Sequence, residues 1–244
     1  MCLKCYRLNH HQPSRHPTDK REKSMSKLEK VALVTGASRG IGAQIAKRLG
    51  IEGFTVIVNY AGNTEAAHAV VHEIQIAGGK AMAVPGDVSN SLAVKRLFDL
   101  AEDNFGGVDL LINNAGISGP ARPQQTLAEM DYDGWAEAFA VNSMGPLRVL
   151  QGLRGQLAAA PLGKAVTITS QLGALSLDWP MSYAYCASKA AVNKVMRLAA
   201  LDFAVKAFHL ALAKVSLFLF VVGPVAVFGF CDVDHLFKTV SVIG

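Results

Sequence analysis

An apolar run long enough to cross a membrane is missing from this chain of 244 residues. The most apolar segment, VSLFLFVVGPVAVFGF at 215–230, is shorter than the ~20 residues of a membrane helix and is interrupted by Gly223 and Pro224. We therefore expect a buried sixth strand followed by a turn there, with membrane insertion as the less favoured alternative. The first 27 residues also lack the apolar core of a secretory signal, and their acidic side chains argue against a mitochondrial leader.

Cysteine is scarce as well, and the four cysteines are scattered, which predicts a reduced, cytoplasmic protein. Cys2 and Cys5 form a CxxC pair with His10 and His11 nearby. A zinc site needs four well-spaced ligands, whereas this tract is short, polar and contains proline. We therefore predict no metal site and a disordered, basic extension over residues 1–27. Met25 would itself be a natural start, so both a leader and an extended gene model remain open.

The chain has little net positive charge outside that extension. The formal net charge is +5, but residues 1–27 hold many of the basic side chains and the remainder is close to neutral. No basic stripe with interleaved aromatic residues follows, so a nucleic-acid partner is not expected. With 51% hydrophobic and 18% charged residues, the chain can build one substantial core, and we expect a single α/β domain over residues 28–244.

Strand-like and helix-like segments alternate along this domain. Short apolar runs closed by turn residues have the pattern of buried parallel strands, and the segments between them carry apolar residues at helical spacing. Such alternation predicts a single doubly wound parallel sheet with helices on both faces, the Rossmann fold. Strands are expected at 30–35, 55–60, 80–88, 108–116 and 164–170, and helices at 41–53, 63–79, 91–107, 126–140, 143–159 and 183–205.

A glycine-rich turn, TGASRGIG at 35–42, separates the first strand from the first helix. Gly36, Gly40 and Gly42 permit a tight turn and bring backbone N–H groups close to a pyrophosphate at the helix N-terminus. The strand–turn–helix context makes dinucleotide binding the favoured interpretation, with a purely structural turn as the alternative.

An acidic residue is absent from the end of the second strand, where a carboxylate would bind the ribose 2′-OH of NAD(H). Asn59 and Tyr60 stand there instead. Arg39 lies within the glycine loop, where a guanidinium could bind a 2′-phosphate. Together these residues favour NADP(H) over NAD(H), and an ordinary solvated arginine is the alternative.

These motifs resemble the short-chain dehydrogenase/reductase family over residues 28–205. TGASRGIG is similar to the family's TGxxxGxG loop, NNAG at 113–116 to its fourth-strand motif, and YCASK at 185–189 to its YxxxK. The resemblance implies that Asp87 and Val88 contact the adenine and that Asn113 braces the sheet. It also implies a cofactor site formed by Gly36, Ser38, Arg39, Gly40, Ile41, Gly42, Asn59, Tyr60, Asp87, Val88, Asn114, Ala115, Gly116, Tyr185 and Lys189.

Tyr185 lies one helical turn before Lys189, whereas Tyr183 lies six residues before it and points elsewhere. A tyrosine with a pKa of about 10 is a poor base, and a nearby ammonium favours the phenolate and lowers that pKa. By the resemblance, Tyr185 gives a proton to a substrate carbonyl while NADPH delivers hydride, and Lys189 also holds the ribose. Tyr183 is then a packing or pocket-wall residue.

The family also uses a serine and an asparagine, and the resemblance assigns these roles to Ser170 and Asn142. Thr169 and Ser176 are the rivals of Ser170. The interval from the serine to the tyrosine is longer than is common in bacterial ketoacyl reductases. It is nearer to a subgroup that includes sniffer-like carbonyl reductases and C-factor-like proteins.

Residues 206–244 depart from the family pattern, because Gly223 and Pro224 reverse its PG turn and the expected threonine is missing. We expect an atypical or truncated C-terminal part without a recognisable seventh strand. Two functions follow: an NADPH-dependent reductase of a small-molecule carbonyl or alcohol, or a cofactor-binding protein with little catalysis. The family commonly pairs subunits through the Tyr/Lys helix and the helix before it, and often through its final strand as well. The resemblance therefore implies a homodimer, and without the final strand not a tetramer, with poor solubility caused by residues 215–230.

Overall fold

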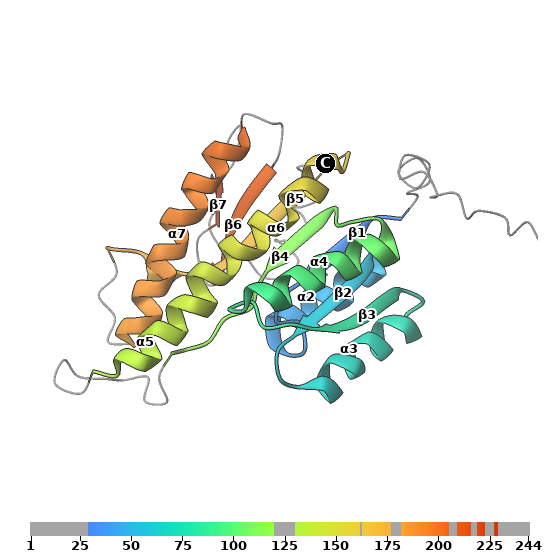
Figure 1. The fold of residues 1–244 in the computed structure, drawn as a ribbon, viewed down its shortest axis with the longest axis horizontal. Helices are drawn as coiled ribbons and strands as arrows, with labels where there is room; N and C mark the ends of the chain where they lie inside the picture. Colours follow the sequence, from blue (N-terminus) through green and yellow to red (C-terminus); the bar gives the residue numbers. More distant parts are fainter. Residues whose placement is uncertain are drawn as a thin grey trace, which may run out of the picture.

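The computed structural model describes residues 29–119, 130–161, 163–176, 182–204, 209–215, 219–222 and 227–228. Its centre is a sheet with the strand order β3-β2-β1-β4-β5-β6-β7-β8, covered by helices (Figure 1). The first six strands pair in parallel and the last two antiparallel. The strands are β1 (Val31–Val34), β2 (Thr55–Tyr60), β3 (Lys80–Pro85), β4 (Leu110–Asn113), β5 (Lys164–Ser170), β6 (His209–Val215), β7 (Leu219–Val222) and β8 (Val227–Phe228).

The helices cover both faces of the sheet, as the alternation in the sequence predicts. One apolar core joins the sheet to α4, α6 and α7, and a second joins its other face to α2 and α3. The doubly wound fold class is therefore confirmed. The helices are α2 (Gly40–Ile51), α3 (Thr64–Ile76), α4 (Ser91–Phe105), α5 (Tyr132–Phe139), α6 (Gly145–Ala159) and α7 (Tyr183–Ala204).

Asparagine side chains begin two of these helices. Asn63 caps α3 by accepting a hydrogen bond from Ala66 N at 2.9 Å, which settles the choice between Asn63 and Thr64. Asn90 caps α4 in the same way. Each carbonyl oxygen satisfies N–H groups that the first turn of a helix leaves without intrahelical partners.

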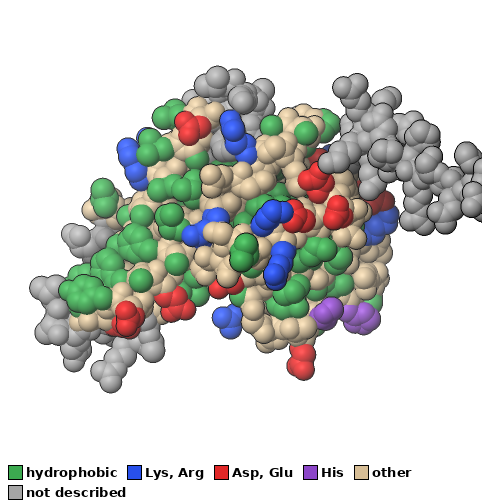
Figure 2. All heavy atoms as spheres, in the orientation of Figure 1, with side chains coloured by type: hydrophobic (Ala, Val, Ile, Leu, Met, Phe, Trp, Pro, Cys, Tyr) green, Lys and Arg blue, Asp and Glu red, His purple; other side chains and the backbone are tan. Residues whose placement is uncertain are grey.

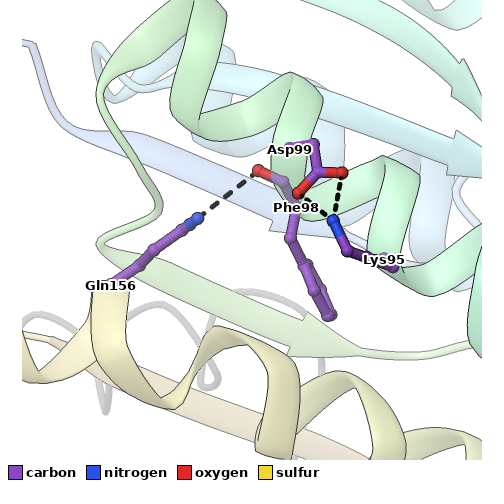
Figure 3. A network of polar contacts seen from close by, with 4 residues as sticks. All are labelled: Lys95, Phe98, Asp99 and Gln156. Carbon is purple, nitrogen blue, oxygen red and sulfur yellow. Dashed lines mark hydrogen bonds and ion pairs between the residues drawn. The ribbon is translucent and has the colours of Figure 1, made fainter.

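Helix α4 packs on α6 through the ring of Phe98 (Figure 3), which lies against Gly152. A Cβ on Gly152 would lie 1.7 Å from the Phe98 ring, so only glycine allows this approach. Next to it, Gln156 Nε2 donates a hydrogen bond to the Phe98 carbonyl at 3.4 Å. The ion pair between Lys95 and Asp99, one turn apart at 2.7 Å, lies on the exposed side of α4. The contacts of Gly152 and Gln156 with Phe98 hold α6, and with it the turn that precedes α6, against α4.

The helical segment before β5 differs from its prediction. We expected two separate helices, at 126–140 and 143–159. In the structure α5 and α6 are joined without a break by a π-helical turn, Ala140–Met144, whose flanking residues keep helical backbone angles. Residues 120–129 lie outside the described residues, so the predicted start at 126 does too.

The sixth strand was placed wrongly. Residues 215–230 do not form it; His209–Val215, directly after α7, pairs in parallel with β5. A parallel return needs a crossover such as a helix, and α7 supplies it before residue 209. Only three residues, 216–218, separate β6 from β7, which is enough for a hairpin and not for a crossover, so β7 pairs antiparallel. The predictions for residues 1–27 and for the segment after 228 lie outside the described residues.

Within the described residues, no helix combines the length and the apolar character of a membrane span. Figure 2 shows charged side chains of both signs on one face of the molecule, with hydrophobic side chains gathered over α5 and α7. No group of three or more metal-ligating side chains is found in the part of the chain described here.

Candidate active site

The glycine loop and the loop after β4 meet where the strand order reverses. β1 pairs with both β2 and β4, so the segments that follow β1 and β4 leave the sheet side by side at their carboxyl ends. A Cβ on Gly36 would lie 2.8 Å from Ala115 Cα, and one on Gly42 would lie 2.4 Å from Asn114 Nδ2. Ligands of open α/β sheets bind in the crevice at this switch point.

The start of α2 is shaped for an anion. Gly36 and Gly40 have φ angles of +62° and +56°, which side chains rarely adopt. Arg39 precedes the helix, and its side chain does not cap it. The first N–H groups of α2 therefore keep their capacity to donate hydrogen bonds to a phosphate. These residues fit a dinucleotide, because no side chain caps the first turn of α2 and because Gly36 and Gly42 let the glycine loop lie directly against Ala115 and Asn114.

Polar contacts tie the two loops together. Asn114 Nδ2 donates to the carbonyls of Thr35 at 2.9 Å and Gly36 at 3.0 Å. The Thr35 hydroxyl accepts from the N–H groups of Asn114 and Ala115, both at 3.0 Å. Sequence reasoning missed this role of Thr35, although its place as the first residue of TGASRGIG is a usable signal. Asn113 donates to Pro146 O and to Thr167 Oγ1, so it braces the sheet.

The residues proposed for the adenosine end divide into buried and exposed groups. Asn59 is buried, and its amide donates to the carbonyls of Val84 and Gly86 at 3.3 and 2.9 Å, so it holds β2 to the end of β3. Tyr60 and Val88 are also buried. Asp87 is exposed, and its carboxylate accepts from Ser89 N. Other predicted cofactor residues lie at the surface of the glycine loop: Ser38 is half-buried, and Arg39 and Ile41 are exposed.

Arg39 is free to bind a ligand. Its side chain is exposed and makes no hydrogen bond or ion pair with any residue that the structure describes. A guanidinium without a protein partner beside a helix N-terminus can bind a phosphate with two parallel hydrogen bonds.

The structure separates the three hydroxyls that compete at the end of β5. Thr169 Oγ1 donates to Asn193 Oδ1 at 2.7 Å and so joins β5 to α7. Ser176 lies on an exposed turn. Ser170 is buried at the carboxyl end of β5, and its hydroxyl interacts with the Tyr185 phenol. Of the three, Ser170 is the hydroxyl beside the proposed acid.

Tyr185 and Lys189 share a face of α7, with Lys189 Nζ 5.7 Å from the centre of the Tyr185 ring. Lys189 is 4% exposed and donates a hydrogen bond to Ile168 O at 3.2 Å. Burial lowers the pKa of its ammonium to about 8. Tyr183, by contrast, is 46% exposed at the start of the helix.

The prediction that Lys189 lowers the pKa of Tyr185 below its usual value is wrong. Burial raises the pKa of the Tyr185 phenol above its usual value of 10, and the Ser170 hydroxyl opposes this only in part. The reason is desolvation, which penalises the phenolate more than the neighbouring groups stabilise it. At neutral pH Tyr185 is therefore a protonated phenol, which is the form needed to donate a proton.

Asn142 lies in the π-helical turn and is 1% exposed. Its Oδ1 accepts from Ile117 N at 2.8 Å, and its Nδ2 donates to Ile117 O at 2.8 Å and to Ser188 Oγ at 3.0 Å. A Cβ on Gly116 would lie 3.3 Å from Asn142 Oδ1 and 3.6 Å from Lys189 Nζ. Two of the catalytic residues predicted from sequence, Asn142 and Lys189, thus border the loop predicted to hold the cofactor.

Comparison with known proteins assigns the family. Residues 30–213 match the family model described as short chain dehydrogenase, which covers more than half of the chain. The chain belongs to the short-chain dehydrogenase/reductase family. It is an oxidoreductase of this family with a Rossmann-type fold. The resemblance to the sniffer-like subgroup stays a prediction.

Relatives and solved structures match most of the chain. An uncharacterized oxidoreductase of Methylorubrum extorquens is 40% identical over 172 residues, covering 70% of this chain and 66% of its own length. A 3-oxoacyl-acyl-carrier-protein reductase (FabG) of Staphylococcus epidermidis is 37% identical over 177 residues, covering 72% and 70%. A metagenomic short-chain oxidoreductase solved with NADP is 32% identical with a TM-score of 0.73, covering 89% and 92%. The chain thus spans about two thirds of the length of these two sequence relatives.

Proposed function

We propose that this chain transfers hydride between NADP(H) and the carbonyl or secondary alcohol of a small molecule, with Tyr185 as general acid and base. The observation that carries the proposal is that Asn142 and Lys189 border Gly116, in the loop that contacts the glycine loop, while Tyr185 lies beside Lys189 on the same face of α7. A second candidate, a cofactor-binding protein with little catalysis, has no comparable support, because all four proposed catalytic side chains are present.

The cofactor, when bound, would supply or accept the hydride. The protein residues handle the proton and the orientation of the substrate. Tyr185 is protonated at neutral pH and can donate from Oη to the carbonyl oxygen, while the Ser170 hydroxyl orients that oxygen. Lys189, with a pKa of about 8, is mainly an ammonium at neutral pH and stabilises the phenolate that donation leaves behind. In the oxidation direction the same phenolate accepts the proton.

We further propose NADP(H) rather than NAD(H) as the cofactor. Arg39 supports this preference because it is exposed beside the N-terminus of α2. Asn59 supports it because an asparagine at this position, unlike a carboxylate, does not repel a 2′-phosphate. The Asn59 amide itself donates its hydrogen bonds to backbone carbonyls of the protein. A relative solved with NADP agrees with the proposal without deciding it.

A homodimer formed through α6 and α7 is part of this proposal. Its support is the hydrophobic surface over α5 and α7 in Figure 2, which would be covered by a second copy. The large exposed apolar side chains on α5, the π-helical turn and α7 are Tyr132, Met144, Tyr183, Leu198 and Leu201. The side chains of 215–230, on which we predicted poor solubility, lie outside those described. The cytoplasmic location stays a prediction from the scattered cysteines.

Oxidation of NADPH with a panel of aldehydes and ketones tests the function. Tyr185→Phe removes the phenolic hydroxyl and should reduce turnover by at least ~100-fold while NADPH still binds. Tyr183→Phe is the matched control, because its ring is at the start of the same helix and is half-exposed. If both variants keep or both lose activity, Tyr185 is not the acid. If the unaltered chain reduces no member of the panel, the function itself is wrong.

A further inference from the structure

Ser188 lies between Tyr185 and Lys189 on α7 and has no contact with solvent. Its hydroxyl donates to the Tyr185 carbonyl at 2.8 Å and accepts from Asn142 Nδ2 at 3.0 Å. A hydroxyl is the smallest side-chain group that can donate and accept at once. Ser188 is therefore suited to join the backbone of α7 to a side chain of the π-helical turn.

Asn142 carries this connection onward to the loop after β4. Both ends of its amide bind the backbone of Ile117, each at 2.8 Å. Ile117 directly follows Gly116, which borders both Asn142 and Lys189. A continuous line of hydrogen bonds thus runs from the Tyr185 backbone through Ser188 and Asn142 to this loop.

The line is buried and closed. Asn142 and Ser188 are 1% and 0% exposed, so water cannot reach them to replace a lost hydrogen bond, and losing one is costly. Without the Ser188 hydroxyl, Asn142 Nδ2 would keep only the Ile117 carbonyl as acceptor. The amide would keep its two bonds to Ile117, but the line would no longer connect the loop to α7.

A second serine provides a comparison. Ser143, the residue after Asn142, donates from Oγ to the Ser188 carbonyl at 2.8 Å and is also buried. It joins the same two elements through the backbone, without contact to the Asn142 amide. A variant of Ser143 therefore serves as a control: it weakens the contact between the π-helical turn and α7 but leaves the hydrogen bonds of the Asn142 amide in place.

We infer that Ser188 is a positioning residue, which acts through Asn142 to keep Tyr185 and Lys189 in register with the loop at 114–117. The inference rests on the proposed function, since register matters only if this loop holds the cofactor beside the tyrosine. Ser188 does not touch the reacting atoms. Its effect is on turnover, because a misplaced acid slows proton transfer without removing the cofactor site.

The test compares Ser188→Ala, Ser143→Ala, Asn142→Ala and the double variant of Ser188 and Asn142. We expect Ser188→Ala to lower kcat about tenfold while the KM for NADPH changes less than about twofold. Ser143→Ala should lose much less turnover. Because Ser188 acts through Asn142, the double variant should lose no more than Asn142→Ala alone.

Hydrogen exchange at the Ile117 amide gives a reading that needs no activity. Ser188→Ala should reduce the protection of this amide, and Ser143→Ala should not. Unchanged kcat and protection in Ser188→Ala, equal losses in the two serine variants, or additive losses in the double variant would each overturn the inference. If the unaltered chain is inactive, the proposed function fails, and the exchange measurement alone decides whether Ser188 holds the loop.

Discussion

Replacing Lys189 with methionine should make the protein inactive and, at neutral pH, more stable. The ammonium is 4% exposed, and burial lowers its pKa from 10.5 to about 8. A change of this size corresponds to about 3 kcal/mol of unfavourable free energy at neutral pH. Methionine has a similar length and no charge, but it leaves the Ile168 carbonyl without its hydrogen bond, which costs about 1 kcal/mol. The net expectation is a gain of about 2 kcal/mol in the free energy of unfolding.

The pH dependence identifies the cause. Between pH 8 and 10.5 the unfolded chain binds a proton at Lys189 that the folded chain has released, so the unaltered protein becomes more stable as pH rises through this window. Lys189→Met lacks this effect. The gain in free energy of unfolding of the variant over the unaltered protein should therefore be largest below about pH 8 and decrease above it. Near pH 10.5 the variant should be slightly less stable, because it still lacks the hydrogen bond to Ile168.

Urea denaturation of both proteins at several pH values measures this difference, and other titrating groups largely cancel because the two chains share them. NADPH oxidation by the same samples should be lost in the variant at every pH. A variant that is less stable at pH 7, or a difference that does not vary with pH, would refute the argument that burial of the charge is costly.

Three further outcomes are expected. Gly42→Ala should lower the free energy of unfolding by about 3 kcal/mol, because its Cβ would lie 2.4 Å from a side-chain amide of the loop after β4. Gly40→Ala, whose Cβ meets nothing within 4 Å, should cost only the ~1 kcal/mol of its φ of +56°; equal costs in urea denaturation would contradict the close approach. Arg39→Ala should weaken NADPH binding about tenfold and leave NADH binding nearly unchanged, and equal losses in fluorescence titration would exclude a phosphate contact. Replacing Leu198 and Leu201 by serine should shift a dimer toward monomer in light scattering, and an unaffected assembly would exclude this part of α7 from the interface.

The order of helices and strands could be predicted from the sequence because it depends on local patterns. The apolar run 55–60 coincides with β2, and the glycine loop stands between a strand and a helix, as its motif requires. Tyr185 and Lys189 lie on one face of α7 because a helix brings residues four apart together. The spacing of the residues was sufficient for each of these.

Features that arise from contacts between distant segments could not be predicted from the sequence and were decided by the tertiary structure. The choice of Ser170 over Thr169 follows from Asn193, which engages the threonine across the fold. The raised pKa of Tyr185 follows from burial, which no local pattern reports. The sixth strand could not be assigned from its apolar character, because two apolar segments compete and only the crossover through α7 decides that His209–Val215 reaches the parallel position. The sequence by itself determined which residues meet within one element, and the packing of elements decided which groups are desolvated and which hydroxyls remain free to act.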